Sequence, residues 1–146
     1  MTAIKSILVA EDNDDDFEFM EHAFKKYNIQ NYIHRCLNGF EVMDYLHQRG
    51  RFVDVKENLR PQIILLDINM PKKDGYDVIK ELKVHPEYCR IPIIVLTTSD
   101  DELDIKKCYE LGANSYIVKP ITLQAYLEAT RLIKDYWLNL TVLPKE

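Results

Sequence analysis

Five short apolar runs alternate with five amphipathic segments along this chain, and this alternation constrains its fold more than any other feature. The runs have the length and composition of strands buried inside a sheet. They cover residues 4–10, 32–37, 62–67, 93–97 and 115–118. The segments that follow them carry apolar residues at helical spacing. They cover residues 14–28, 40–48, 76–84, 101–111 and 121–137. The sequence therefore predicts five β/α pairs.

Strict alternation of strands and helices predicts a parallel sheet with helices on both faces, joined by right-handed crossovers. We expect an α/β, flavodoxin-like, doubly wound fold whose five-stranded parallel sheet has the order 2-1-3-4-5. A length of 146 residues suits one domain. We therefore expect a single domain over residues 1–146, with a core at 4–137 and an apolar tail at 138–146. The polar segment 51–60 is predicted to be a loop.

Acidic residues follow two of the predicted strands. Glu11 and Asp12 come directly after the first strand, and Asp67 ends the third. These strands are neighbours in the expected order, so the three carboxylates should converge at one edge of the sheet. Two like charges about 4 Å apart repel by about 4 kcal/mol at an effective dielectric of 20. A hard divalent cation offsets such repulsion, and Mg²⁺ is the expected cofactor.

Two further strand ends supply groups that complement these carboxylates. Thr97 ends the fourth strand with a hydroxyl, and Lys119 follows the fifth with a positive charge. A carboxylate nucleophile, a metal, a cation and a hydroxyl suit phosphoryl transfer. Solvent exposure explains any one polar strand end, but it does not explain this complementary set. Asp14 to Asp16 open the first helix, where acids cap it and complement its positive end.

Composition excludes several other classes of protein. The formal net charge is −5 with no basic run, which disfavours nucleic-acid binding. The three cysteines include no C-x-x-C pair, which indicates a reducing compartment and neither a disulfide framework nor a zinc site. The sequence has no apolar stretch of membrane-spanning length and no signal-peptide pattern. We expect a cytoplasmic protein.

Four motifs in register resemble the receiver domains of two-component response regulators. They are LVAEDN at the first strand, LLDINMPKKDG at the third, VLTTS at the fourth and YIVKP at the fifth. The resemblance extends from about residue 4 to residue 137. Glu11 departs from the aspartate that is commoner in the family, and Thr98 stands where many receivers have a smaller residue.

The resemblance implies a role for each matching residue. It implies a phosphorylation switch without enzymatic activity beyond its own Mg²⁺-dependent phosphorylation and autodephosphorylation. It also implies a cis bond between Lys119 and Pro120. The implied roles are the phospho-acceptor for Asp67, metal binding for Glu11, Asp12, Asp67 and the backbone carbonyl of Asn69, pairing with the phosphoryl group for Lys119, the switch hydroxyl for Thr97 and the switch aromatic for Tyr116.

A narrower resemblance concerns the segment 51–60, the stretch TTSDDELDI and the tail WLNLTVLP. Together they resemble small single-domain regulators that partner bacterial phytochromes. The partner that this resemblance implies is a sensor histidine kinase of the phytochrome type, with an output through protein–protein contacts. A homodimer is also expected. Two alternatives stay open, a pseudo-receiver interaction module and a metal-dependent aspartate-nucleophile phosphatase. The phosphatase reading is weakened because residues 67–71 lack the D-x-D-G-T pattern.

Overall fold

The computed structural model describes residues 5–56 and 60–144, and it confirms the predicted sheet. Five parallel strands have the order β2-β1-β3-β4-β5. The strands are β1 (Ser6–Ala10), β2 (Tyr32–Cys36), β3 (Pro61–Leu66), β4 (Ile93–Thr97) and β5 (Ser115–Val118). The helices are α1 (Asp14–Lys26), α2 (Gly39–Leu46), α3 (Gly75–Lys83), α4 (Glu102–Leu111) and α5 (Leu123–Ile133), with a 3₁₀ turn at Gly50–Phe52 and a π-helical segment at Lys134–Leu140.

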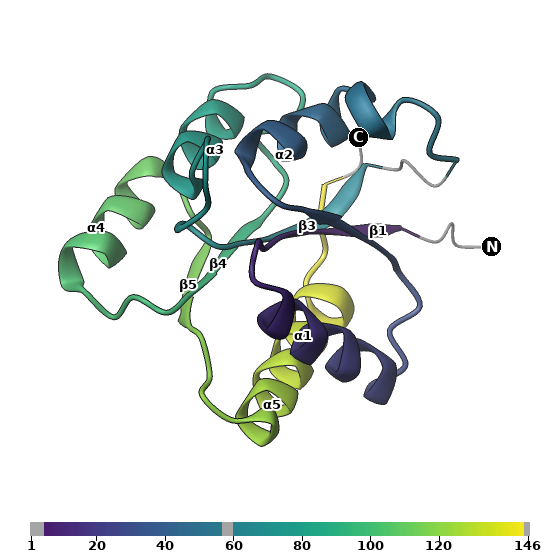
Figure 1. Ribbon diagram of the computed structural model, residues 1–146, viewed down its shortest axis with the longest axis vertical. Helices are drawn as coiled ribbons and strands as arrows, with labels where there is room; N and C mark the ends of the chain where they lie inside the picture. The colour runs from purple at the N-terminus through teal and green to yellow at the C-terminus, as the bar shows by residue number, and fades with distance from the viewer. Residues whose placement is uncertain (1–4, 57–59, 145–146) are drawn as a thin grey trace.

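Helices cover both faces of the sheet, as the alternation requires. Helices α2, α3 and α4 lie on one side, and α1 and α5 lie on the other (Figure 1). Each side has its own apolar core, because alternate residues of each strand point to opposite faces. Leu8 and Ile64 face the core beneath α2 and α3, whereas Ile7 and Ile63 face the core beneath α1 and α5. The central strands are therefore buried on both faces, which explains their continuous apolar sequences.

The register of the strands brings their carboxyl ends to one edge. Ala10, the last residue of β1, pairs with Leu66, the last residue of β3. On the other side, Thr97 at the end of β4 pairs with Val118 at the end of β5. Residues that follow these four strands therefore meet at the same edge of the sheet, which is where the sequence predicted a site.

Polar caps fix where the helices begin. Five helices start after a residue whose side-chain oxygen accepts a backbone N–H of the first turn, which satisfies a donor that the helix leaves free. These residues are Asn13, Asn38, Asp74, Asp101 and Thr122. Helix α4 ends at Gly112, whose φ of 113° suits glycine far better than other residues.

Four predicted helices end earlier than expected. The helices predicted over 40–48 and 76–84 end at Leu46 and Lys83. The helix predicted over 14–28 ends at Lys26, and Asn28 has a left-handed φ of 55°. The helix predicted over 121–137 runs as an α-helix to Ile133 only, and a π-helical segment continues the chain to Leu140. This segment places Leu138 and the later Leu143 against the core beneath α1 and α5. The tail therefore packs on its own domain through part of its apolar residues.

Three other expectations need correction or lie outside the described residues. The segment 51–60 is not entirely a loop, because Gly50–Phe52 forms a 3₁₀ turn that buries Phe52 edge-on against Tyr45. Residues 57–59 of that segment, and residue 4 of the first predicted strand, lie outside the described part of the chain. The expected cis bond at Lys119–Pro120 is wrong. This bond is trans, like every other described bond, in line with the modest trans preference of X–Pro.

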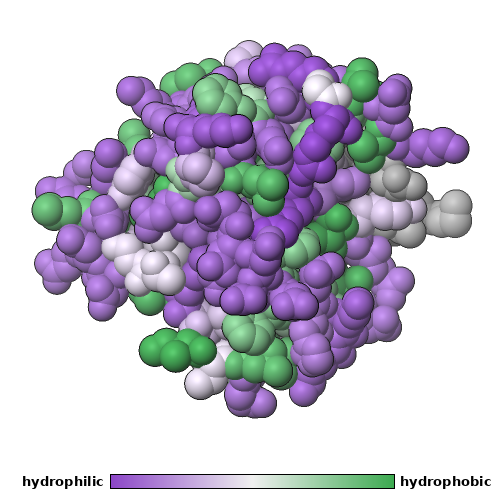
Figure 2. Space-filling view, viewed as in Figure 1, coloured by the Kyte–Doolittle hydropathy of each residue, from purple (hydrophilic) through white to green (hydrophobic). Residues whose placement is uncertain are grey.

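The surface seen from the side of Figure 1 is mostly hydrophilic, with apolar side chains near the loop between β5 and α5 (Figure 2). In that loop Ile121 is almost fully exposed, and Val118 before it is also exposed. Within residues 5–56 and 60–144, no helix combines the length and the apolar character needed to cross a bilayer.

Candidate functional site

Strands β1 and β3 deliver three carboxylates to one point at the sheet edge. Glu11 and Asp12 follow β1, and Asp67 follows β3. One oxygen from each lies within 4.8 Å of the others, and we call these three residues the carboxylate cluster. Glu11 is fully buried and Asp67 is nearly so, whereas Asp12 is exposed. Two buried acids beside an exposed one form an oxygen-rich site that opens to solvent, a donor set that suits a hard divalent cation.

Lys119 is the positive charge at the centre of this site. Its Nζ donates hydrogen bonds to Asp67 Oδ2 and Asp16 Oδ2, each at 2.8 Å. It also lies 2.7 Å from Glu11 Oε1. The backbone N–H of Lys119 donates to the carbonyl of Thr97, which ties the residue to the end of β4. Burial alone lowers the pKa of this ammonium, but its carboxylate partners outweigh burial and raise the pKa, so Lys119 is fully charged.

Glu11 is a buried carboxyl whose negative charge is only partly compensated by Lys119. Burial raises the pKa of its carboxyl to about 7, and repulsion from Asp67 adds to this effect while Lys119 opposes it. Its Oε2 accepts the backbone N–H of Asn13 at 3.1 Å. Its buried Oε1 contacts Lys119 as an ion pair, yet no well-aligned hydrogen bond reaches it from the described residues. A buried oxygen in this state fits a metal ligand.

The loop after β3 fixes the orientation of Asp67. Asp67 Oδ1 accepts the backbone N–H of Asn69 at 3.0 Å, so its two oxygens have separate partners. Asn69 Nδ2 lies 3.5 Å from the hydroxyl of Thr97, which is fully buried at the end of β4. Gly75 closes the loop, and a Cβ there would lie 2.5 Å from Ile68 Cα and 2.7 Å from the Asp67 carbonyl oxygen. Only glycine allows α3 to begin this close to Asp67.

Tyr116 lies on β5, the strand that pairs with β4, opposite Val95. It is half-buried, and its hydroxyl donates to the carbonyl of Ser99 at 2.8 Å. Ser99 also donates its hydroxyl to Asp104 of α4 at 2.6 Å, and the hydroxyl of Tyr76 donates to the same carboxylate at 2.5 Å. The loop between β4 and α4 is therefore held by Tyr116 on one side and by this polar cluster on the other.

The structure brings all the predicted site residues to one edge of the sheet and adds Asp16, whose role the sequence did not predict. From the sequence, Asp16 is expected to serve the start of α1. The helix cap is instead Asn13, whose side chain accepts the backbone N–H of Asp16, while the carboxylate of Asp16 turns to Lys119. The available signal was its position, because an acid in the first turn of a helix that leaves this edge lies close to the site.

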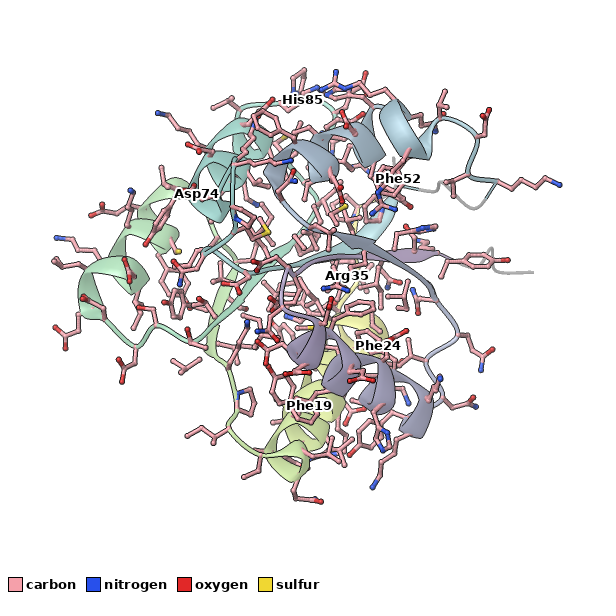
Figure 3. The ribbon with its side chains drawn as sticks, viewed as in Figure 1. Phe19, Phe24, Arg35, Phe52, Asp74 and His85 are labelled. Carbon is pink, nitrogen blue, oxygen red and sulfur yellow. The ribbon has the colours of Figure 1, made fainter. Side chains whose placement is uncertain are left out.

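Arg35 of β2 closes the site on the side of α1. It lies between the sheet and the start of this helix (Figure 3). Its Nε donates to the carbonyl of Glu11 at 2.9 Å, and its guanidinium pairs with Asp14 at 2.8 Å and stacks over Phe17. Arg35 therefore fixes the backbone at Glu11 without contacting the carboxylates of the cluster.

Comparison with known proteins gives one consistent family. The family model described as response regulator receiver domain matches residues 7–131. The response regulator Rcp1 of Synechocystis is 36% identical over 140 residues, covering 96% of this chain and 93% of Rcp1. A phosphorylated cyanobacterial phytochrome response regulator, RcpA, superimposes with a TM-score of 0.89 at 37% identity, covering 98% of this chain and 100% of RcpA. The Mn²⁺-bound form of Rcp1 superimposes with a TM-score of 0.85 at 37% identity, covering 97% of this chain and 99% of Rcp1.

Proposed function

Because this chain belongs to the response regulator receiver family, we propose that it is a phosphorylation switch whose acceptor is Asp67. The donor is a phosphohistidine of a sensor histidine kinase. The observation that carries this proposal is the pairing of the nearly buried Asp67 with a charged lysine, beside two more carboxylates. An isolated acid at a strand end has no such surroundings.

The reaction is a transfer between two covalent carriers. A carboxylate oxygen of Asp67 attacks the phosphorus atom, the P–N bond to the kinase histidine breaks, and the departing imidazole takes up a proton from solvent. Mg²⁺, held by Glu11, Asp12, Asp67 and the carbonyl of Asn69, would neutralise charge on the phosphoryl oxygens when bound. Lys119 would orient and stabilise the same oxygens with its charged ammonium, which lies next to Asp67, and little other covalent chemistry is needed.

Phosphorylation then acts on the residues next to the site. The added phosphoryl group carries extra negative charge and strong acceptor oxygens. The buried hydroxyl of Thr97 turns towards it, and Tyr116 responds by adjusting its contact with the carbonyl of Ser99. This shifts an existing equilibrium between two arrangements of β5, α4 and the loop before it. The output is a change in protein–protein contacts and not an enzymatic reaction.

The relatives guide the choice of partner. RcpA is a phytochrome response regulator, so we propose a phytochrome-type sensor histidine kinase as the donor for this chain. We also propose one receiver domain over residues 1–146 that works as a homodimer. The tail supports the dimer, because Leu140 and Val142 remain exposed while Leu138 and Leu143 pack on their own domain. A protein that stays monomeric at high concentration, with and without phosphorylation, would contradict the dimer.

The test is an intact-mass measurement after incubation with Mg²⁺ and a small acyl phosphate. We expect a gain of one phosphoryl group in the wild type, and none in Asp67→Asn or in a sample with a chelator. If neither the small donor nor the phosphorylated partner kinase adds a phosphoryl group, the switch is wrong and the chain is a pseudo-receiver. Turnover of a simple phosphoester would point to the phosphatase alternative.

A further inference from the structure

Asp16 is a fourth acid at the site, but it is oriented differently from the other three. Its Oδ2 accepts a hydrogen bond from Lys119 Nζ at 2.8 Å. Its Oδ1 accepts one from the hydroxyl of Tyr126 on α5 at 3.2 Å. Its oxygens are not part of the carboxylate cluster. Asp16 therefore connects the site lysine to α5, and both of its oxygens have protein hydrogen-bond partners.

Tyr126 is a firmly held anchor for this connection. It is only 2% exposed, and it belongs to the core beneath α1 and α5. Its ring packs 5.3 Å from that of Phe19, which extends from α1 towards α5 (Figure 3). Burial, with the nearby charge of Asp16, raises the pKa of the phenol, so the hydroxyl keeps the proton that it donates. The position of Oδ1 is thus set by the packing of α5.

A lysine side chain needs such an anchor if it is to act at a fixed point. It has four rotatable bonds and a compact charge, so packing alone specifies its ammonium poorly. Here the ammonium donates hydrogen bonds to Asp67 and Asp16 at 2.8 Å each, and it also lies 2.7 Å from Glu11 Oε1. Removing the second contact leaves the ammonium free to follow Glu11 or Asp67, and a reacting group displaced by about 1 Å can slow a reaction by up to about a hundredfold.

We propose that Asp16 is a positioning residue, anchored by Tyr126, which holds the Lys119 ammonium in place beside Asp67. The consequence for the reaction rests on the proposed phosphorylation of Asp67. The arrangement itself does not, because the hydrogen bonds from Tyr126 to Asp16 and from Lys119 to Asp16 exist without a phosphoryl group or a metal. The two parts can therefore be tested separately.

The first measurement uses metal-free protein. An ammonium that is buried and held by carboxylates exchanges its protons slowly, so ¹⁵N-edited NMR should resolve a Lys119 Nζ signal that Lys119→Met removes. We expect Asp16→Asn to shift or broaden this signal, and Tyr126→Phe to shift it less. Asp15→Asn is the matched control, because it removes the same charge from the same turn at an exposed position. A signal that is missing in the wild type, or unchanged in Asp16→Asn, overturns the proposal whatever the phosphorylation assay gives.

The second measurement follows phosphorylation by an acyl phosphate. We expect Asp16→Asn to lower the rate constant at saturating Mg²⁺ by about tenfold. We expect Tyr126→Phe to lower it by about threefold, the effect of one modest hydrogen bond. Because Tyr126 acts through Asp16, the double variant should be no slower than Asp16→Asn alone.

The metal dependence separates positioning from metal binding. The Mg²⁺ concentration for half-maximal rate should change by less than about twofold in Asp16→Asn, since the oxygens of Asp16 accept hydrogen bonds from Lys119 and Tyr126 and are not part of the carboxylate cluster. A large increase would make Asp16 a metal ligand, and an equal loss of rate in Asp15→Asn would reduce its role to general charge. Either result contradicts the proposal. Absence of any phosphorylation of the wild type would refute the proposed function instead, and the NMR result would still decide the role of Asp16.

Discussion

Replacing Glu11 by glutamine should stabilise the metal-free protein at pH 8, although it alters the site. Glu11 is fully buried, and burial followed by repulsion from Asp67 raises the pKa of its carboxyl from 4.5 to about 7, against the opposing effect of Lys119. The ionised carboxylate therefore destabilises the folded state. A neutral amide of nearly the same shape avoids this cost.

The size and sign of the effect follow from the two pKa values. The folded state binds the Glu11 proton more tightly than the unfolded state. The resulting stability is fully present below pH 4.5 and is lost as the pH rises through about 7. Between pH 4.5 and about pH 7, at about 1.4 kcal/mol per pH unit, the free energy of unfolding falls by about 3 kcal/mol. Glu11→Gln lacks this titration. Its free energy of unfolding should therefore exceed that of the wild type by about 3 kcal/mol at pH 8 and by less than about 1 kcal/mol at pH 5.

Urea unfolding in the presence of a chelator measures this difference. Trp137, the single tryptophan, packs partly against the core beneath α1 and α5 and provides the fluorescence signal. Glu21→Gln removes an exposed acid from α1 and serves as the control, with no expected change at either pH. Equal stability of Glu11→Gln and wild type at pH 8, with unchanged denaturant slopes, would refute the reasoning.

Added Mg²⁺ should reduce the difference in the free energy of unfolding between Glu11→Gln and the wild type. A ligand at a hundredfold its dissociation constant stabilises the folded state by about 2.7 kcal/mol. The wild type gains this stabilisation at a Mg²⁺ concentration where Glu11→Gln gains less, because a neutral amide replaces one of the carboxylate ligands. The acid that is expected to destabilise the metal-free fold is thus the acid that would make its stability respond to the metal.

Three further substitutions test other parts of the site. Gly75→Ala should destabilise the protein by about 1–3 kcal/mol in urea unfolding and reduce the proposed phosphorylation, because its Cβ would clash with the backbone of Ile68 next to Asp67. Tyr76→Phe should speed amide hydrogen exchange in the first turn of α4 by about fivefold, because it removes a hydrogen bond to Asp104. Asp12→Asn should raise the half-saturating Mg²⁺ concentration at least about tenfold in a phosphorylation titration, with little change in metal-free stability because this side chain is exposed.

The sheet and the edge that carries the site were predictable because both depend on local patterns and on topology. The β-branched runs identified β1, β3 and β4, and the boundaries predicted for β4 and β5 match the structure. Once the strand order is known, the residues after β1 and β3 must be neighbours, so the meeting of Glu11 and Asp67 follows without side-chain information. The neighbourhood of Lys119 follows from the same logic.

Contacts between elements that are distant in the chain could not be predicted from the sequence. Asp16 and Tyr126 are 110 residues apart, and their contact depends on how α1 packs against α5, which no motif specifies. The π-helical segment after Ile133 also escaped prediction, because residues 121–137 keep an apolar pattern that fits an uninterrupted α-helix. Its actual course depends on the fit of Leu138 into the core, a tertiary effect that overrides local preference.

The two helices beside the acceptor loop differ in how they are attached, and this difference suits a switch. Helix α3 buries four residues against the sheet, whereas Cys108 is the one buried residue of α4 among those described. Helix α4 therefore depends more on polar contacts, chiefly those of Asp104 with Tyr76 and Ser99. Exchanging hydrogen bonds near the surface costs less than opening an apolar core. Of the two helices, α4 is therefore the one that the proposed phosphorylation of Asp67 would displace at the lower cost.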